Sequence, residues 1–277
     1  MKVTSDKISW GSLAKTLVPV FESQAERIAV AVQGGEMKHQ FDKFLAAMQS
    51  FSVRVITAEE LVEFLALYWL TGPAWESIFK RCPFVSRNPV SQNLNIMLRK
   101  LSANGCIVES TECLRKFYGS VESRMADVRD AMTRQDLINE LCQTFITIAF
   151  PRIAKQMGVV YTPWEIVDFI NHSVDDSLQA SHGRRLTDPD VAILDPFAGT
   201  GNFMVRLLCT GLIRNEDMRR KYEHEITCHE ICLFAWYIGL IAIESAYHEI
   251  MGHEEYVPFR AMRLVDTFAE YEQESIT

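Results

Sequence analysis

The sequence is poor in the features that mark disulfide-bonded, metal-binding or membrane proteins. Its seven cysteines form an odd set without a C-x-x-C pair, and no second pair lies near Cys228 and Cys232 to complete a zinc site. Free thiols in a reducing cytoplasm are the simplest interpretation. No two histidines have the H-x-x-x-H spacing, so no metal site is predicted.

Long apolar runs and excess positive charge are also missing. The longest apolar run, ICLFAWYIGLIAI from Ile231 to Ile243, is shorter than the roughly 20 residues that span a bilayer, and no signal peptide is visible. We therefore expect a cytoplasmic protein without membrane contact, and the run predicts a buried helix. The net charge of -8 has the wrong sign for binding nucleic acid by bulk electrostatics, although a local basic patch can coexist with it.

The first part of the chain has the pattern of helices. Thr57 and Glu60 form a capping box ahead of the apolar stretch ELVEFLALYWL. Asn88 is suited to cap a helix that has Pro89 at its first position. These signals predict a helical N-terminal domain over residues 1–150.

After Pro151 the pattern changes to alternating strands and helices. A helix is expected to begin at a second capping box, Thr162 to Glu165, with Pro163 in its first turn. Strands are predicted at VAILD, EITCHE and RAMRLVD, separated by helices that start near Asn202 and Ile231. Strand, helix, strand, helix, strand is the beginning of an open parallel sheet, so residues 151–277 are predicted to form an α/β domain.

The turn in VAILDPFAGTGNFMVRLL is the strongest functional signal. Asp195 ends the strand, and Gly199 and Gly201 permit positive φ and a close approach of a ligand to the backbone. A P-loop would need a lysine after Gly201, and a dinucleotide fingerprint would need glycine where Met204 stands. S-adenosylmethionine fits better, because Asp195 can hold its cationic amine while backbone N–H groups bind its carboxylate.

The string DPFAGTGNF resembles motif I of the S-adenosylmethionine-dependent DNA adenine-N6 methyltransferases. The stretches GVVYTPWEIVDFINHSVDD, HEICLFAWYIGLIAIESAYH and LVDTF are similar, in that order, to the methyltransferase region of type ISP (single-polypeptide type I-like) restriction-modification enzymes. VITAEELVEFLALYWL and NPVSQNLNIML resemble the coupler of those enzymes. The resemblance implies a coupler followed by the first half of a Rossmann-like methyltransferase sheet. It also implies that nuclease, helicase and target-recognition domains lie outside this chain and that the complete enzyme acts on double-stranded DNA.

The resemblance also implies roles for individual residues. The triplet at residues 161–163 matches motif X at the methionine end of the cofactor, Glu230 matches the acid that bridges the ribose hydroxyls, and Asp266 matches the acceptor for the adenine amine. For residues 161–163 the competing interpretation is an ordinary helix start, and for Asp266 it is a solvated aspartate at the end of a strand. For Phe203 the competing interpretation is packing in the core. Glu225 competes with Glu230 but would lie at the start of its strand. The implied cofactor-binding set is Tyr161, Thr162, Pro163, Asp195, Pro196, Phe197, Ala198, Gly199, Thr200, Gly201, Asn202, Phe203, Glu230, Ile231, Asp266 and Phe268.

No catalytic residue is assigned. The family's Asn-Pro-Pro-Tyr/Phe motif binds the flipped adenine, and the only Asn-Pro here, Asn88-Pro89, is followed by Val90 and Ser91. The chain therefore looks like a truncated gene product or an expressed fragment, which we expect to be inactive alone. Missing strands would leave a parallel sheet edge exposed, so we expect a homodimer or marginal solubility.

Two other functions stay open. One is a helical adaptor with a degenerate α/β appendage that binds DNA or a partner protein without a cofactor. The other keeps S-adenosylmethionine but changes the substrate, because RNA and protein-glutamine methyltransferases share the turn. The recognition sequence on DNA is not encoded in this chain, since target-reading domains lie elsewhere in such enzymes.

Overall fold

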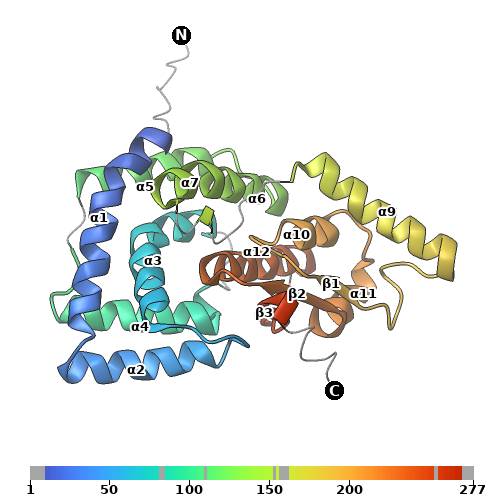
Figure 1. Ribbon diagram of the computed structural model, residues 1–277. Coiled ribbons are helices and arrows are strands. Elements are labelled where there is room, and N and C mark those ends of the chain that lie inside the picture. The colour runs from blue at the N-terminus through green and yellow to red at the C-terminus, as the bar shows by residue number, and fades with distance from the viewer. Residues whose placement is uncertain are drawn as a thin grey trace, which may run out of the picture. The chain divides into compact units, whose positions relative to one another are not determined.

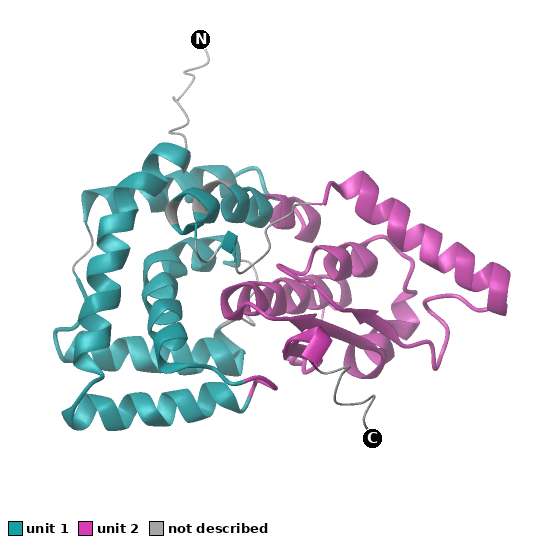
Figure 2. Cartoon of the chain, viewed as in Figure 1, with its two compact units in different colours: residues 1–50, 55–128, 137–155 teal, residues 51–54, 129–136, 156–277 magenta. Residues whose placement is uncertain are grey.

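The computed structural model describes residues 10–80, 85–108, 111–151, 154–155, 162–252 and 255–269. One residue of the predicted site, Tyr161, lies outside them. The chain divides into two compact units (Figure 2). The first comprises residues 1–50, 55–128 and 137–155, and the second comprises residues 51–54, 129–136 and 156–277. Two short segments of the helical part therefore belong to the second unit, which a single boundary at residue 150 does not anticipate.

The first unit is built from helices around a central one. Helix α3 is buried on nearly all sides, as expected for a helix whose sequence is apolar all round, and α1 and α5 both pack against it (Figure 1). Helix α2 packs against α4. The elements are α1 (Trp10–Ala31), α2 (Gly35–Gln49), α3 (Ala58–Ile78), η1 (Val85–Arg87), α4 (Pro89–Ala103), α5 (Glu112–Met125), the π-helical η2 (Leu141–Ile146) and α7 (Thr147–Ala149).

The predicted helix starts of this unit are confirmed. The Thr57 hydroxyl accepts a hydrogen bond from the backbone N–H of Glu60 at 3.1 Å, at the start of α3. Asn88 Oδ1 accepts from the N–H groups of Val90 and Ser91 at 2.9 and 3.1 Å, with Pro89 as the first residue of α4. These local bonds satisfy N–H groups that have no partner within the helix.

The second unit contains a three-stranded parallel sheet of order β1-β2-β3. Its strands are β1 (Ile193–Asp195), β2 (Ile226–Glu230) and β3 (Met262–Leu264), at the three predicted positions. In the sheet, Asp195 is opposite Cys228 and Glu230 is opposite Leu264. Residues 51–54 lie along β3, where the N–H groups of Val53 and Arg54 donate to the carbonyl of Leu264. The α/β class is thus confirmed, with β1 at one edge of the described sheet.

Helices connect and cover these strands. Helix α12 contacts β2, β3 and α10, and it is buried along most of its length, as its apolar sequence predicts (Figure 1). Helix α9 packs against α10. The helices are α6 (Ala131–Glu140), whose residues 131–136 belong to this unit, α9 (Trp164–His182), α10 (Asn202–Cys209), α11 (Asn215–Arg220), the π-helical η3 (Lys221–Glu225) and α12 (Leu233–Met251).

The glycine turn between β1 and α10 lies directly on the backbone of α12. A Cβ atom added to Gly239 of α12 would be 2.8 Å from the carbonyl oxygen of Gly199 and 2.9 Å from Cε of Met262. A Cβ added to Gly201 would be 3.3 Å from the carbonyl oxygen of Gly239, and Gly201 has φ +86°. Glycine at both positions therefore permits this approach of turn and helix.

We expect Gly239→Ala to destabilise the second unit by about 1–3 kcal/mol, because the new methyl group overpacks a contact with backbone atoms. Gly119→Ala is the matched control. Gly119 is also inside a helix, nothing lies within 4 Å of its added Cβ, and alanine there should stabilise the helix by up to about 1 kcal/mol. Urea unfolding of both variants measures the difference. Equal stabilities would contradict the proposed contact.

Candidate functional site

Three acidic residues lie at or just after the carboxyl ends of the three strands, at one edge of the sheet. Asp195 and Glu230 are the last residues of β1 and β2, and Asp266 comes two residues after β3. Because the strands are parallel, their carboxyl ends lie together, which is where ligands bind in open α/β sheets. The structure therefore brings the three predicted carboxylates to the same side of the second unit.

Asp195 is buried and only half satisfied. Its side chain is 8 % exposed, and Oδ1 accepts a hydrogen bond from the backbone N–H of Phe197 at 3.2 Å. Oδ2 is buried and has no hydrogen-bond partner. Burial raises the pKa of Asp195 to about 6, and the bond from Phe197 only partly opposes this. A buried carboxylate oxygen without a partner is costly, so this atom marks a place for a donor or cation.

Glu230 ties the glycine turn to the start of α12. Its Oε2 accepts from the N–H of Gly199 at 2.8 Å, and its Oε1 accepts from the N–H of Cys232 at 2.7 Å. Burial raises the pKa of Glu230, while these backbone bonds act in the opposite direction. A carboxylate has about four acceptor sites, so Glu230 can still accept from a ligand. The sequence predicted that α12 begins near Ile231, but it begins at Leu233. The second bond explains this difference.

Glu225, the competing acid, lies at the opposite end of β2. It accepts from the N–H of Asp190 at 3.0 Å and pairs with Lys221 at 2.7 Å. Arg220 pairs with the same carboxylate. Glu225 is therefore part of an ion-pair cluster at the start of the strand, away from the strand ends that carry Asp195 and Glu230.

Two exposed aromatic rings flank the strand ends. The rings of Phe197 and Phe268 have centroids 5.6 Å apart and are 63 % and 69 % exposed. Asp266 is half-buried and accepts from the N–H of Phe268 at 3.0 Å. Ile231 is also exposed. Between Asp266 and Phe268, the buried Thr267 hydroxyl donates to the carbonyl of Pro196 at 2.7 Å and joins two loops.

The backbone of the glycine turn is largely satisfied within the protein. The N–H of Ala198 donates to the carbonyl of His229, and the N–H of Gly201 donates to the carbonyl of Ala198, both at 2.8 Å. The N–H of Gly199 is used by Glu230. The first N–H groups of α10, beginning at Asn202, have no partner within that helix. They are the part of the turn best suited to an anionic group.

A cavity of about 340 Å³ lies between α9, β1 and α10. It includes four residues of the predicted set, Asp195, Pro196, Phe197 and Phe203, so the strand end and the start of α10 face it. Glu230, Asp266 and Phe268 are not among its lining residues. The remaining lining residues are Ile170, Asn171, Val174, Leu186, Ile193, Leu194, Met204 and Leu207.

The start of α9 lacks the predicted side-chain cap, and a residue of α10 contacts it instead. The helix begins at Trp164, with the carbonyl of Pro163 accepting from Val167, and no side-chain bond caps it. The predicted capping by Thr162 is therefore wrong, since the residue before the helix is Pro163. Instead, Arg206 of α10 pairs with Asp168 and lies 5.1 Å from the centroid of the Trp164 ring.

One polar residue missed by sequence analysis reaches the turn. Gln135 of α6 donates from Nε2 to the carbonyl of Thr200 at 2.9 Å and to Oδ1 of Asn202 at 2.8 Å. Asn171 of α9 donates to the carbonyl of Phe203 at 3.3 Å. No motif marks Gln135 or Asn171, and only their position in the folded chain connects them with the turn.

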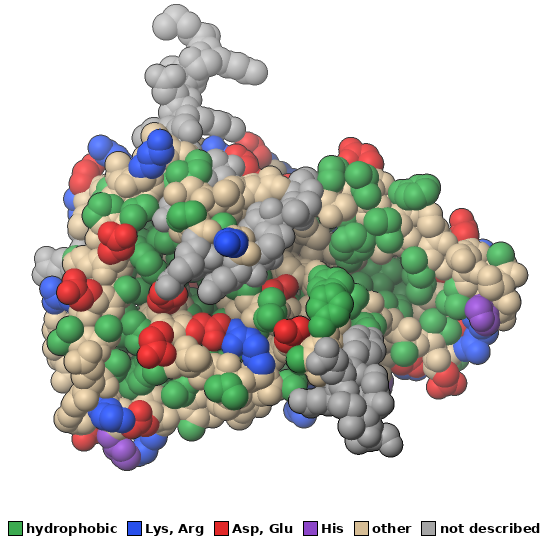
Figure 3. Space-filling model, in the orientation of Figure 1, with side chains coloured by type: hydrophobic (Ala, Val, Ile, Leu, Met, Phe, Trp, Pro, Cys, Tyr) green, Lys and Arg blue, Asp and Glu red, His purple; other side chains and the backbone are tan. Residues whose placement is uncertain are grey.

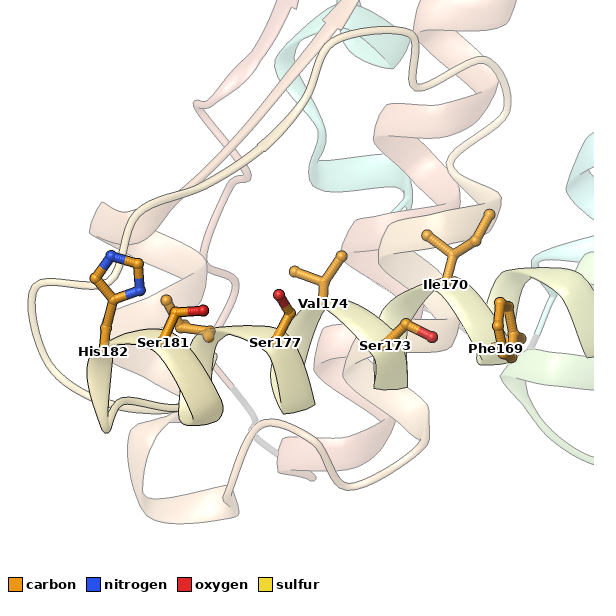
Figure 4. Close-up of a pocket in the computed structure, with 8 residues that line it drawn as sticks. Phe169, Ile170, Ser173, Val174, Ser177, Ser181 and His182 are labelled. Atoms are coloured by element: carbon orange, nitrogen blue, oxygen red, sulfur yellow. The ribbon is translucent and has the colours of Figure 1, made fainter.

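Helix α9 turns an apolar face outward. Hydrophobic side chains gather on the surface of this helix in Figure 3, and Ile166, Phe169, Ile170 and Val174 are all exposed. Figure 4 shows Ile170, Val174 and Ser177 pointing to the same side of the helix, where they line an open groove. Leu194 in the edge strand β1 is exposed as well. The expected exposed sheet edge is thus present in the described residues, and it lies beside an apolar surface.

Among the residues that the structure describes, no group of three or more His, Cys, Asp or Glu side chains is arranged to hold a metal ion. No helix in the described ranges has both the length and the apolar character needed to cross a membrane.

Comparison with a family model places the helical part. Residues 9–133 match the model of the Type ISP restriction-modification enzyme, coupler domain. The predicted resemblance of the helical part to such a coupler is confirmed. No curated protein matches the sequence.

Solved structures resemble nearly the whole chain. A nuclease-deletion mutant of the Type ISP restriction-modification enzyme LlaGI, in complex with a DNA substrate mimic, matches 94 % of this chain at 35 % identity with a TM-score of 0.75. The ATP-dependent Type ISP enzyme LlaBIII, bound to DNA, matches the same share with the same identity and TM-score. A DrdV–DNA complex matches 93 % at 25 % identity with a TM-score of 0.72. The chain spans 21 %, 18 % and 25 % of the lengths of these three proteins.

The burial of Asp195 predicts a pH-dependent stability. Its folded-state pKa of about 6 is above its unfolded value, so the stability that this group contributes is present at low pH and lost as the pH rises through 6. Asp195→Asn removes the buried charge. The stability of this variant relative to wild type should therefore increase by about 2 kcal/mol when the pH is raised from 4.5 to 7.5. Urea unfolding at both pH values measures this change.

Asp176→Asn is the control for loss of one negative charge, because the Asp176 side chain is 80 % exposed on α9. Its stability difference from wild type should stay within about 0.5 kcal/mol at both pH values. If the difference in unfolding free energy between wild type and Asp195→Asn were the same at both pH values, this would contradict the burial of an ionisable carboxylate at the end of β1.

Proposed function

We propose that the second unit binds S-adenosylmethionine and is the cofactor-binding part of a DNA adenine-N6 methyltransferase in a larger restriction-modification enzyme. The single observation that carries this proposal is the buried, unpartnered Oδ2 of Asp195 beside the glycine turn. A carboxylate in this position favours a cationic ligand and repels a pyrophosphate. S-adenosylmethionine has a cationic amine next to a carboxylate, so it supplies the missing partner.

The surrounding residues fit the other parts of the same molecule. Asp195 would hold the amine, and the N–H groups at the start of α10 would hold the carboxylate. Glu230 has about four acceptor sites and can still accept from the ribose hydroxyls. Phe197 and Phe268 offer exposed rings beside Asp266, which would accept from the adenine amine.

When bound, S-adenosylmethionine supplies an electrophilic methyl group. The residues of this chain bind and orient that cofactor. The chain has no Asn-Pro-Pro-aromatic motif, so none of its residues is assigned to base binding or to the transfer step.

DNA as the substrate rests on the relatives. Similar solved structures were determined with DNA or a DNA substrate mimic, and two of them are Type ISP enzymes. The net charge of -8 favours DNA contacts through other parts of a longer protein. We therefore propose that the complete enzyme binds DNA. This enzyme would include the nuclease, helicase and target-recognition domains expected elsewhere.

A second candidate is a cofactor-free adaptor. It is favoured by the way Glu230 uses both oxygens on backbone N–H groups, which completes the turn without a ligand. The match of residues 9–133 to a coupler domain is equally consistent with it. The two functions differ in whether S-adenosylmethionine binds.

We expect saturable calorimetric binding of S-adenosylmethionine to the 277-residue chain at pH 7.5, and at least tenfold weaker binding to Asp195→Asn, because a charge-assisted bond is lost. Asp176→Asn should bind like wild type. Since Asp195→Asn is expected to be the more stable protein at this pH, weaker binding would not reflect unfolding. A folded wild-type chain that binds no S-adenosylmethionine would favour the adaptor.

Binding should also depend on pH through the same carboxylate. The cationic amine favours ionised Asp195, whose pKa in the free protein is about 6. Affinity should therefore fall below pH 6, by up to about tenfold per pH unit. The titration repeated between pH 5 and pH 8 measures this decline, and Asp195→Asn should not show it. An equal decline in both proteins would assign the effect to another group.

A further inference from the structure

Gln135 holds the central peptide group of the glycine turn from outside the turn. Its side chain is 1 % exposed, and its amide nitrogen donates to both the Thr200 carbonyl and Oδ1 of Asn202. A glutamine NH₂ group has two hydrogens, so both of its donors are used. The contact crosses 65 residues of sequence to the first acceptor and 67 to the second.

The first bond locks the orientation of one peptide plane. The Thr200 carbonyl and the Gly201 N–H belong to the same planar group and point in opposite directions. Gln135 binds the carbonyl, and the carbonyl of Ala198 binds the N–H at 2.8 Å. Because Gly201 has φ +86° and glycine permits many conformations, this plane would be easy to rotate without both bonds.

The second bond orients the first side chain of α10. Oδ1 of Asn202 accepts from Gln135, so the amide NH₂ of Asn202 remains available as a donor at the helix start. This is the same end of α10 whose backbone N–H groups are proposed to bind the cofactor's carboxylate.

The segment that carries Gln135 is itself firmly attached to the second unit. Arg134 is 4 % exposed and pairs with Glu249 of α12 at 2.6 Å. On the other side, Asp136 accepts from the indole N–H of Trp164 at the start of α9. The bonds of the neighbouring residues Arg134 and Asp136 to other helices thus fix the position of Gln135 beside the turn.

We propose that Gln135 is a positioning residue for the cofactor turn, acting through the Thr200 carbonyl and the Asn202 amide. This rests on the proposed binding of S-adenosylmethionine. Gln135 holds the turn in the conformation that presents the start of α10 to the ligand, and it does so before any ligand binds.

The test uses three variants of the full chain. Gln135→Met keeps the size of the side chain but removes both donors, and Gln135→Glu places carboxylate oxygens against two oxygen acceptors. Glu249→Gln is the control, because it removes a charge from the partner of Arg134 but keeps an oxygen acceptor for it, so the segment stays attached. A pure packing role would leave Gln135→Met equal to wild type.

Hydrogen exchange of the ligand-free chain is the first readout. The hydrogen-bonded turn amides of Ala198, Gly199 and Gly201 should exchange at least tenfold faster in both Gln135 variants, and faster in Gln135→Glu than in Gln135→Met. Glu249→Gln should exchange these amides like wild type. Unchanged exchange at the turn in Gln135→Met would overturn the proposal.

Calorimetric titration with S-adenosylmethionine is the second readout. If wild type binds, Gln135→Met should bind at least tenfold more weakly while Glu249→Gln binds normally. Faster exchange without weaker binding would overturn the role in positioning the ligand. If folded wild type does not bind, the proposed cofactor function fails. In that case the exchange experiment still decides whether Gln135 sets the conformation of the turn.

Discussion

The contact of the glycine turn with the backbone of α12 controls the geometry of the whole second unit. Gly239 has no side chain, so the carbonyl oxygen of Gly199 can approach the helix to a position only 2.8 Å from where a Cβ atom would lie. Once the turn lies there, β1 ends at Asp195 and α10 starts at Asn202 in fixed positions. Glu230 then bonds the turn to the start of α12, which connects the ends of two strands.

This geometry leaves the two buried carboxylates in different states. Glu230 has an N–H partner on each oxygen, whereas Asp195 has a partner on Oδ1 alone. The charge of Asp195 also contributes to raising the pKa of Glu230, so it opposes the ionisation of Glu230. A cationic ligand would relieve this opposition as well as the unsatisfied oxygen. The electrostatics of the site therefore favour a cationic ligand, such as the proposed S-adenosylmethionine, over nucleotides that bring further negative charge.

The apolar surface beside β1 has a different character from the strand-end site. Ile166, Phe169 and Val174 are exposed along α9, and Leu194 is exposed in the edge strand. This chain spans 21 % and 18 % of the lengths of the two similar Type ISP enzymes, and both match 94 % of it. Contiguous exposed apolar patches of this kind are typical of interaction sites.

Sequence by itself determined the local features of this protein. Thr57 and Asn88 cap their helices as predicted, because an N-cap needs only a side-chain oxygen and N–H groups a few residues away. The three strands and the choice of Glu230 over Glu225 also followed from position along the chain, since parallel strands place their last residues at one edge. The start of α9 was misjudged by one residue, because a proline carbonyl opens that helix without a side-chain cap.

Tertiary structure alone decided how these parts meet. No motif assigned a role to Gln135, Gly239 or Arg206, and each acts on a residue far away in sequence: Thr200, Gly199 and Asp168, respectively. It also decided that the Thr267 hydroxyl joins two loops through the carbonyl of Pro196. Whether Asp195 is buried, and which of its oxygens lacks a partner, depends on the packing of β1, α9 and α10 together. Desolvation and long-range hydrogen bonds arise only in the folded chain, so composition and spacing do not contain them.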